Sequence, residues 1–193
     1  MESKKIKVGV MAIDLNPPYW KFANEMLWGI NTFFLKHHSI ADKYDVRLML
    51  WSDIPENPVE ISEKFTGYLV SRGDIPASLI SDTQLQLSLK EDQRPAIEHA
   101  LREMVSIRDR GVTIFPTEPI EWPMPTLLRY NLLLQQEEKL REFDYLFYID
   151  VDMKIVDWIG EEILGNLTAA QHPMYALRQI YHTPFESNPE TSA

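Results

Sequence analysis

The chain has 193 residues, of which 45% are hydrophobic, and it contains no cysteine. This size and composition predict a globular protein with a sizeable core, and the lack of thiols excludes a disulfide framework, a thiolate nucleophile and a cysteine-based zinc site. The formal net charge of −10 argues against a duplex nucleic-acid binder, because neutralising phosphates requires a basic face.

The first fifty residues have the pattern of a β-α-β unit. Residues 5–13 and 46–53 are apolar runs typical of strands, and a turn with two prolines follows the first of them. Between them, residues 19–35 carry apolar side chains at helical spacing. The residues expected to face the sheet are Trp20, Ala23, Leu27, Ile30 and Phe34. Because open α/β sheets bind ligands beyond the carboxyl ends of their strands, residues 11–19 and 51–53 are candidate edges of a site.

The next segments continue the alternation of helices and strands. Residues 56–110 are the least regular part and are expected to form an elaboration on the core, with one clear helix at residues 95–110 that ends at Gly111. A short strand is predicted at residues 112–116 and one continuous helix at residues 125–143. The positions expected to face inward on this last helix are Leu127, Leu128, Leu132, Leu133 and Leu140.

A hydrophobic run that ends in two acids follows this helix. Residues Tyr145 to Ile149 predict a central strand that is covered on both faces, and Asp150 and Asp152 come directly after it. Side chains two apart on an extended strand end point the same way, so both carboxylates could bind one Mg²⁺ or Mn²⁺ ion and, through it, a diphosphate. A nucleotide-sugar transferase requires this chemistry, because the cation neutralises charge on the leaving group.

Two other interpretations of the acidic pair stay open at this point. Both residues could be turn or helix-capping aspartates, which are common at strand ends. The pair could also belong to a phosphatase in which Asp150 is the nucleophile and Asp152 is the acid/base. The phosphatase interpretation is the weaker one, because Met153 and Lys154 stand where that chemistry favours a glycine and a threonine.

The segment FDYLFYIDVDMKIVDWIGEEILGNLTAAQHPMYAL, residues 143–177, resembles glycosyltransferase family 6 from its DVDM motif to its LHP motif. Three shorter segments are similar to other parts of that family: KVGVMAI (residues 7–13), VRLMLWSD (46–53) and EWPMPTLLRYNLL (121–133). The resemblance implies a Rossmann-like nucleotide-diphospho-sugar transferase fold of the GT-A type, with one donor-binding domain over residues 1–193. It also implies a retaining, metal-dependent hexosyltransferase that moves galactose or N-acetylgalactosamine from UDP to a β-galactoside.

The resemblance assigns a metal and a diphosphate to the acidic motif. Asp150 and Asp152 would hold Mn²⁺, or Mg²⁺, and through it the diphosphate of UDP-galactose or UDP-N-acetylgalactosamine. Val151, between them, would lie on the ribose side. Arg129 would face the donor and the two carboxylates.

The resemblance places the uridine along the end of the first strand, at Met11, Ala12 and Ile13. A tyrosine that the family has three residues after this isoleucine falls here on Asn16. Tyr19 would take its place if the two prolines shift the loop.

The acceptor residues implied by the resemblance are His172, which would hydrogen-bond the galactose of the β-galactoside, and the adjoining Pro173. The family's catalytic glutamate belongs to a C-terminal half that the chain is expected to lack, so the alternative is a truncated or split, catalytically incomplete UDP-sugar-binding fragment. No apolar run approaches the roughly 20 residues that span a bilayer. A soluble, cytoplasmic protein of a microbe or a virus-infected cell is therefore expected, without a transmembrane segment or nucleic-acid partner.

Overall fold

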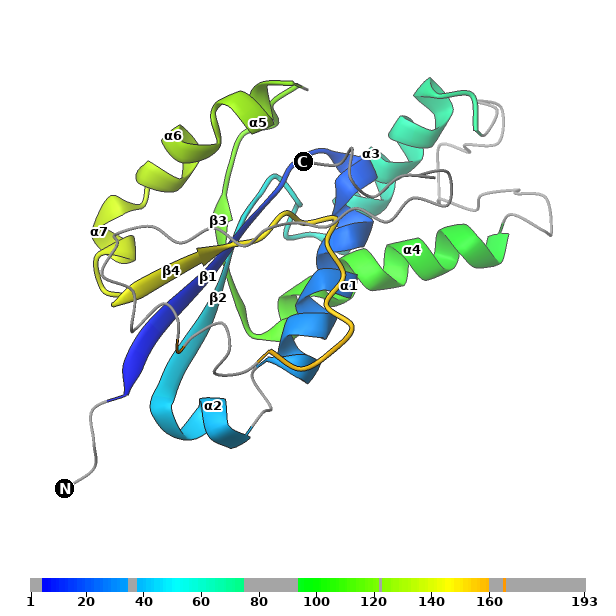
Figure 1. The fold of residues 1–193 in the computed structure, drawn as a ribbon. Helices are drawn as coiled ribbons and strands as arrows, with labels where there is room; N and C mark the ends of the chain where they lie inside the picture. The colour runs from blue at the N-terminus through cyan, green and yellow to red at the C-terminus, as the bar shows by residue number, and fades with distance from the viewer. Residues whose placement is uncertain (1–4, 35–37, 75–93, 122, 160–164, 166–193) are drawn as a thin grey trace, which may run out of the picture.

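In the part of the chain that the structure describes, a four-stranded parallel sheet forms the centre of the fold (Figure 1). The structure is a computed structural model, and it describes residues 5–34, 38–74, 94–121, 123–159 and 165. The strands are β1 (Ile6–Asp14), β2 (Tyr44–Ser52), β3 (Val112–Pro116) and β4 (Tyr145–Tyr148). Each strand lies where the sequence predicted one. All adjacent pairs are parallel, and the spatial order is β3-β2-β1-β4.

The direction in which successive strands are added to the sheet reverses once, although all the strands are parallel. The chain winds outward from β1 through β2 to β3, and it then returns to the other side of β1 with β4. Open α/β sheets bind ligands at such a switch point, beyond the carboxyl ends of the strands. The α/β class and the parallel sheet are therefore confirmed, and the GT-A assignment stays a prediction.

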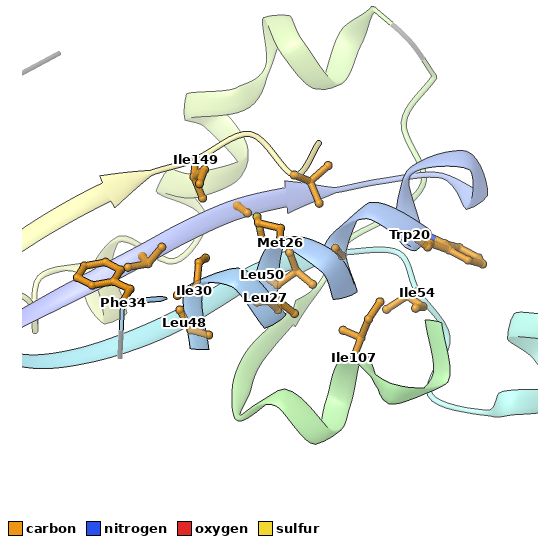
Figure 2. Packing of buried hydrophobic residues seen from close by; sticks show 14 of the residues in the cluster. Trp20, Met26, Leu27, Ile30, Phe34, Leu48, Leu50, Ile54, Ile107 and Ile149 are labelled. Carbon is orange, nitrogen blue, oxygen red and sulfur yellow. The ribbon is translucent and has the colours of Figure 1, made fainter. Parts of the chain in front are cut away.

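Helix α1 (Pro17–Phe33) covers one face of the sheet. It begins with a proline, a residue suited to the first helical position because the N–H that it lacks has no partner there. Its apolar side chains pack with Leu48 and Leu50 of β2 and with Ile149 (Figure 2). All five side chains that the spacing predicted to face the sheet are buried. A short helix, α2 (His38–Lys43), leads directly into β2.

The segment from residue 56 to residue 110 adds helices to the same face. They are α3 (Pro58–Ser71), α4 (Arg94–Ser106) and the 3-10 helix η2 (Ile107–Arg110). The expected helix before Gly111 is confirmed, and Gly111 has the positive φ of 69° that favours glycine at a helix end. Helix α3 was not expected. Ile61, Phe65, Met104 and Ile107 belong to the same core cluster as α1, so the described part of this segment completes the core on this face.

Among the described residues, three short helices cover the opposite face, and the prediction of one continuous helix at residues 125–143 is wrong. The helices are α5 (Met124–Leu127), α6 (Arg129–Leu134) and α7 (Glu137–Leu140). The backbone leaves the helical region at Leu128 and Gln136, and each of these residues precedes a new helix. The breaks change which side chains face the sheet: Leu127, expected to be buried, is 70% exposed. A second core cluster contains Leu132, Leu133, Leu140, Met11, Ile13 and Trp51.

Strand β4 lies at one edge of the described sheet, which corrects the expectation of a central strand covered on both faces. Leu146 of β4 is 42% exposed, and the other side chains of the strand are half-buried. A tyrosine tolerates partial exposure because its ring is apolar and its hydroxyl is polar. The sequence pattern of an apolar run that contains tyrosines therefore does not distinguish an edge strand from a central strand.

The helices in the described ranges include none that is both long enough and apolar enough to cross a membrane. The longest of them, α1, has 17 residues and contains Lys21 and Glu25.

Candidate functional site

A cavity opens at the switch point between β1 and β4. Its volume of about 280 Å³ is close to the lower end of the roughly 300–1,000 Å³ that is usual for small-molecule sites. The residues that line it come from the end of β1 and the start of α1, from α5 and α6, and from the end of β4. They are Ile13, Leu15, Asn16, Tyr19, Pro125, Thr126, Arg129, Tyr148, Asp150, Val151 and Asp152.

The two acids of the DVD motif lie in a turn beside this cavity. The strand ladder continues as far as Ile149, whose N–H donates to the carbonyl oxygen of Met11 at 3.0 Å. The N–H of Met153 then donates to the carbonyl oxygen of Asp150 at 3.0 Å, which closes the turn. The extended strand end assumed from the sequence is therefore wrong, and the interpretation as turn residues is correct for the backbone. Both Asp150 and Asp152 nevertheless line the cavity.

Two side chains hold the carboxylate of Asp150. Nη2 of Arg129, at the start of α6, lies 3.0 Å from Asp150 Oδ1, and the Tyr148 hydroxyl donates to the same oxygen at 3.0 Å. The Arg129 guanidinium also lies over the Tyr148 ring, 4.6 Å from its centroid. Burial, followed by the nearby Asp150 carboxylate, raises the pKa of the Tyr148 phenol above its ordinary value. The phenol therefore stays protonated and able to donate. Each of the three side chains, Arg129, Tyr148 and Asp150, contacts the other two.

The opposite wall of the cavity is fixed around Asp53. One carboxylate oxygen of Asp53 accepts the backbone N–H of Asn16 and the Nε1–H of Trp20, each at 2.8 Å. Asn16 has a φ of 76° and a ψ of 144°, a sparsely populated conformation that costs a non-glycine residue about 1–3 kcal/mol. Its side chain donates to the carbonyl oxygen of Ile120 at 2.9 Å. These bonds hold the connection between β1 and α1 against the end of β2 and the segment that follows β3.

A second carboxyl group lies buried behind this wall. Asp14, the last residue of β1, is fully buried, and its register partner is Ser52 of β2. Neither carboxylate oxygen of Asp14 makes a well-formed hydrogen bond within the described residues. Burial, and then the charge of Asp53, raises the pKa of Asp14 well above its ordinary value, and the Ser52 hydroxyl offsets only part of this increase. The wall therefore contains a carboxyl group that favours its neutral form.

The chain beyond the acidic turn is fixed along α1. Gly29 of α1 permits a close approach there, because a Cβ at this position would lie 2.8 Å from the carbonyl oxygen of Ile155. Four residues later, the N–H of Ile159 donates to the carbonyl oxygen of Phe33 at 3.0 Å. The turn is thus anchored by β4 on one side and by α1 on the other.

The cavity brings together six of the eight residues that the sequence assigned to donor binding: Ile13, Tyr19, Arg129, Asp150, Val151 and Asp152. The other two, Met11 and Ala12, do not line it, because their side chains belong to the core clusters on the two faces of the sheet. His172 and Pro173 lie outside the described residues. The binding role of each of these residues stays a prediction.

The sequence interpretation missed the residues that support the site. Tyr148 stands in the sequence as one residue of a hydrophobic strand, yet it lies two positions before Asp150, and strand alternation indicates that both face the same side. No sequence signal connects Asn16 with Ile120, whose contact joins positions 104 residues apart.

The acidic turn offers the type of ligand that a hard cation prefers. Asp150 and Asp152 supply carboxylate oxygens, which suit Mg²⁺ and Mn²⁺. Within the part of the chain that the structure describes, no group of three or more His, Cys, Asp or Glu side chains is placed to hold a metal ion. A cation at this turn would therefore need ligands beyond these two carboxylates, such as phosphate oxygens and water.

The part of the chain that contains this turn matches known proteins. Residues 126–193 match the model of glycosyltransferase family 6. A stretch of 67 residues is 39% identical to globoside alpha-1,3-N-acetylgalactosaminyltransferase 1 of Homo sapiens. Residues 126–193 are therefore similar to glycosyltransferase family 6. The family resemblance inferred from the sequence is thereby confirmed.

The extent of these matches is limited. The stretch similar to the human protein is 34% of this chain and 19% of that relative. The family match includes α6, β4 and the acidic turn, and it does not reach β1, α1 or β2. The similarity inferred for residues 7–13 and 46–53 therefore stays a prediction. The wall that carries Arg129, Asp150 and Asp152 is the one that lies within the family match.

Proposed function

We propose that this chain binds the UDP-sugar donor of a retaining hexosyltransferase in the cavity between β1 and β4. The observation that carries the proposal is the meeting of Asp150, Asp152 and Arg129 at one cavity, all three within the residues that match glycosyltransferase family 6. The enzyme transfers galactose or N-acetylgalactosamine from UDP to a β-galactoside acceptor. His172 and Pro173 are the proposed acceptor contacts.

The two walls of the cavity suit the two ends of a nucleoside diphosphate. Ile13, Leu15 and Tyr19 on the β1 side supply apolar and aromatic surface for the base and the ribose. Arg129, on the other side, has a planar guanidinium that matches the geometry of phosphate oxygens. This distribution of polar and apolar groups supports uridine against β1 and the diphosphate at the acidic turn.

Charge balance supports a metal requirement. Asp150 and Asp152 would repel a diphosphate, and Arg129 supplies one positive charge against two carboxylates. These two acids would hold Mn²⁺ or Mg²⁺ together with the diphosphate, and the bound cation would neutralise charge on the departing UDP. Metal dependence is therefore part of the proposal.

In the proposed reaction, the bond between the anomeric carbon and the UDP oxygen breaks, and the acceptor hydroxyl oxygen bonds to the same face of that carbon. The acceptor proton passes to the departing phosphate oxygen, so the products are UDP and a β-galactoside extended by one hexose. Arg129 stabilises the negative charge that develops on UDP. The human relative is named as an alpha-1,3-N-acetylgalactosaminyltransferase, which supports N-acetylgalactosamine as one of the two donor sugars to test.

The proposal is tested by calorimetric titration of UDP into the chain with and without Mn²⁺. We expect binding that requires Mn²⁺ and that weakens by more than about a hundredfold in an Asp150→Asn, Asp152→Asn double variant. Mutation of residues that only support metal ligands lowers metal affinity roughly 10–100-fold, so removal of the ligands themselves should cost more. Asp157→Asn is the matched control, because Asp157 is exposed and does not line the cavity. Absence of Mn²⁺-dependent binding to the unchanged chain would overturn the proposal.

Transfer is measured separately, with UDP-galactose and UDP-N-acetylgalactosamine and a β-galactoside. The anomeric configuration of the product, determined by NMR, should match that of the donor. UDP binding without transfer would reduce the proposal to a UDP-sugar-binding fragment. Release of phosphate that depends on Asp150 alone would replace it with a phosphatase.

A further inference from the structure

We propose that Tyr148 is a positioning residue that holds Arg129 and Asp150 in the arrangement that receives the donor diphosphate. This inference rests on the proposed function of the cavity. Tyr148 lies outside the DVD motif, and it contacts the motif and the arginine of α6 at the same time.

Tyr148 uses two parts of its side chain for these contacts. Its hydroxyl donates to Oδ1 of Asp150 at 3.0 Å, and its ring lies under the Arg129 guanidinium, 4.6 Å from centroid to carbon. Nη2 of Arg129 lies 3.0 Å from the same Oδ1. Because both donors share Oδ1, the other carboxylate oxygen of Asp150 is left for a cation, and no further side-chain partner of Asp150 occurs among the described residues.

Tyr148 is fixed by the sheet, whereas its two partners are more open. It pairs in register with Met11 of β1 and packs on the second core cluster. The side chains of Arg129 and Asp150 are 28% and 45% exposed, and an ion pair at this level of exposure contributes only about 0–1 kcal/mol and holds its geometry weakly. A ring and a hydroxyl anchored in the sheet restrict both partners before the ligand arrives, so less conformational freedom is lost on binding.

The experiment compares Tyr148→Phe, which keeps the ring and removes the hydroxyl, with Tyr148→Leu, which removes both. Tyr148→Phe should weaken Mn²⁺-dependent UDP binding about tenfold, because a hydrogen bond to a charged group is lost. Tyr148→Leu should weaken it roughly fivefold more, because the support of the guanidinium is lost as well. Tyr145→Phe is the matched control, since Tyr145 lies on the same strand and packs with the first core cluster.

A second readout separates positioning from general support of the fold. Binding of uridine, followed by saturation-transfer NMR, should be unchanged in Tyr148→Phe, because uridine has no diphosphate for Arg129 and Asp150 to position. If the unchanged chain fails to bind UDP with Mn²⁺, the proposed function fails, and this inference fails with it.

If the unchanged chain binds UDP and Tyr148→Phe binds it equally well, the positioning role alone is overturned. Equal losses for uridine and UDP would also overturn it, because they indicate a general structural role. If Tyr148→Leu is unfolded by circular dichroism, Tyr148→Phe decides the question, because it keeps the ring in the core.

Discussion

The two walls of the cavity are built by different means. On the β1 wall, the carboxylate of Asp53 accepts a backbone N–H and an indole N–H and so fixes a strained turn at Asn16. On the β4 wall, a half-exposed ion pair and one phenol hold Asp150. Changes in the first wall are therefore expected to alter the stability of the fold, and changes in the second are expected to alter affinity for the ligand.

The two walls also differ in their similarity to known proteins. The family match begins at residue 126 and contains the β4 wall, while the β1 wall lies before it. The wall inside the family match carries the charged groups that suit a diphosphate, whereas the wall before it offers apolar surface together with Asn16. Variants on each wall can break or sharpen this comparison.

The largest effect is expected from Asp14→Asn on the pH dependence of stability. Burial raises the pKa of Asp14 in the folded protein above its ordinary value of 3.8, so the folded state retains a proton that the unfolded chain has released. The stability that this group contributes is complete below pH 3.8 and is lost as the pH rises through the raised folded pKa. The amide has no such proton, so its free energy of unfolding should fall less from about pH 4 to about pH 9 in urea titrations.

Asp109→Asn is the control for this experiment, because Asp109 is exposed. Its pH profile should follow that of the unchanged protein. If Asp14→Asn also follows the unchanged profile, Asp14 is not a neutral buried carboxyl group. UDP affinity at neutral pH should be the same in all three proteins.

A smaller effect is expected from removal of the acceptor at Asp53. Asp53→Ala leaves the Asn16 N–H and the Trp20 indole without their partner, and it should lower the free energy of unfolding by about 2 kcal/mol. Asp53→Asn keeps a carbonyl oxygen that can accept both bonds, and it should cost less than about 1 kcal/mol. Urea titration measures both changes, and an equal loss in the two variants would mean that charge, rather than hydrogen bonding, fixes this wall.

The smallest effect on the free energy of unfolding is expected from Arg129→Ala, which should mainly alter ligand binding. UDP binding in the presence of Mn²⁺ should weaken about tenfold, or about 1.4 kcal/mol. Mn²⁺ binding without UDP should tighten, because the positive charge of the guanidinium beside Asp150 no longer repels the cation. The free energy of unfolding should change by less than about 1 kcal/mol, as for other exposed ion pairs.

Calorimetry and Mn²⁺ electron paramagnetic resonance test these two opposite changes. Arg141→Ala is the control, because Arg141 pairs with Glu137 on α7 and does not line the cavity. A change of the same sign for UDP and for Mn²⁺ alone would contradict the assignment of the β4 wall to the ligand.

The sequence alone determined the local elements that depend on neighbouring residues. The spacing of apolar residues predicts the strands and α1, and the glycine at position 111 predicts the end of a helix. Both signals depend only on residues a few positions apart. The sequence also located the acidic pair, because a run of apolar residues that ends in two acids is visible without a fold. It failed at residues 125–143, where the backbone leaves the helical region at Leu128 and Gln136. Leucine and glutamine both favour helices, so their propensities do not indicate these breaks.

Only the tertiary structure decided how these elements combine into a site. The return of β4 to the far side of β1 creates the switch point, and no local pattern encodes which edge a strand joins. The same placement brings the Tyr148 ring under Arg129 and turns the acidic pair toward Asn16 and Tyr19. These contacts join segments distant in sequence, and their geometry is set by the packing of both sheet faces at once, which a one-dimensional pattern does not contain.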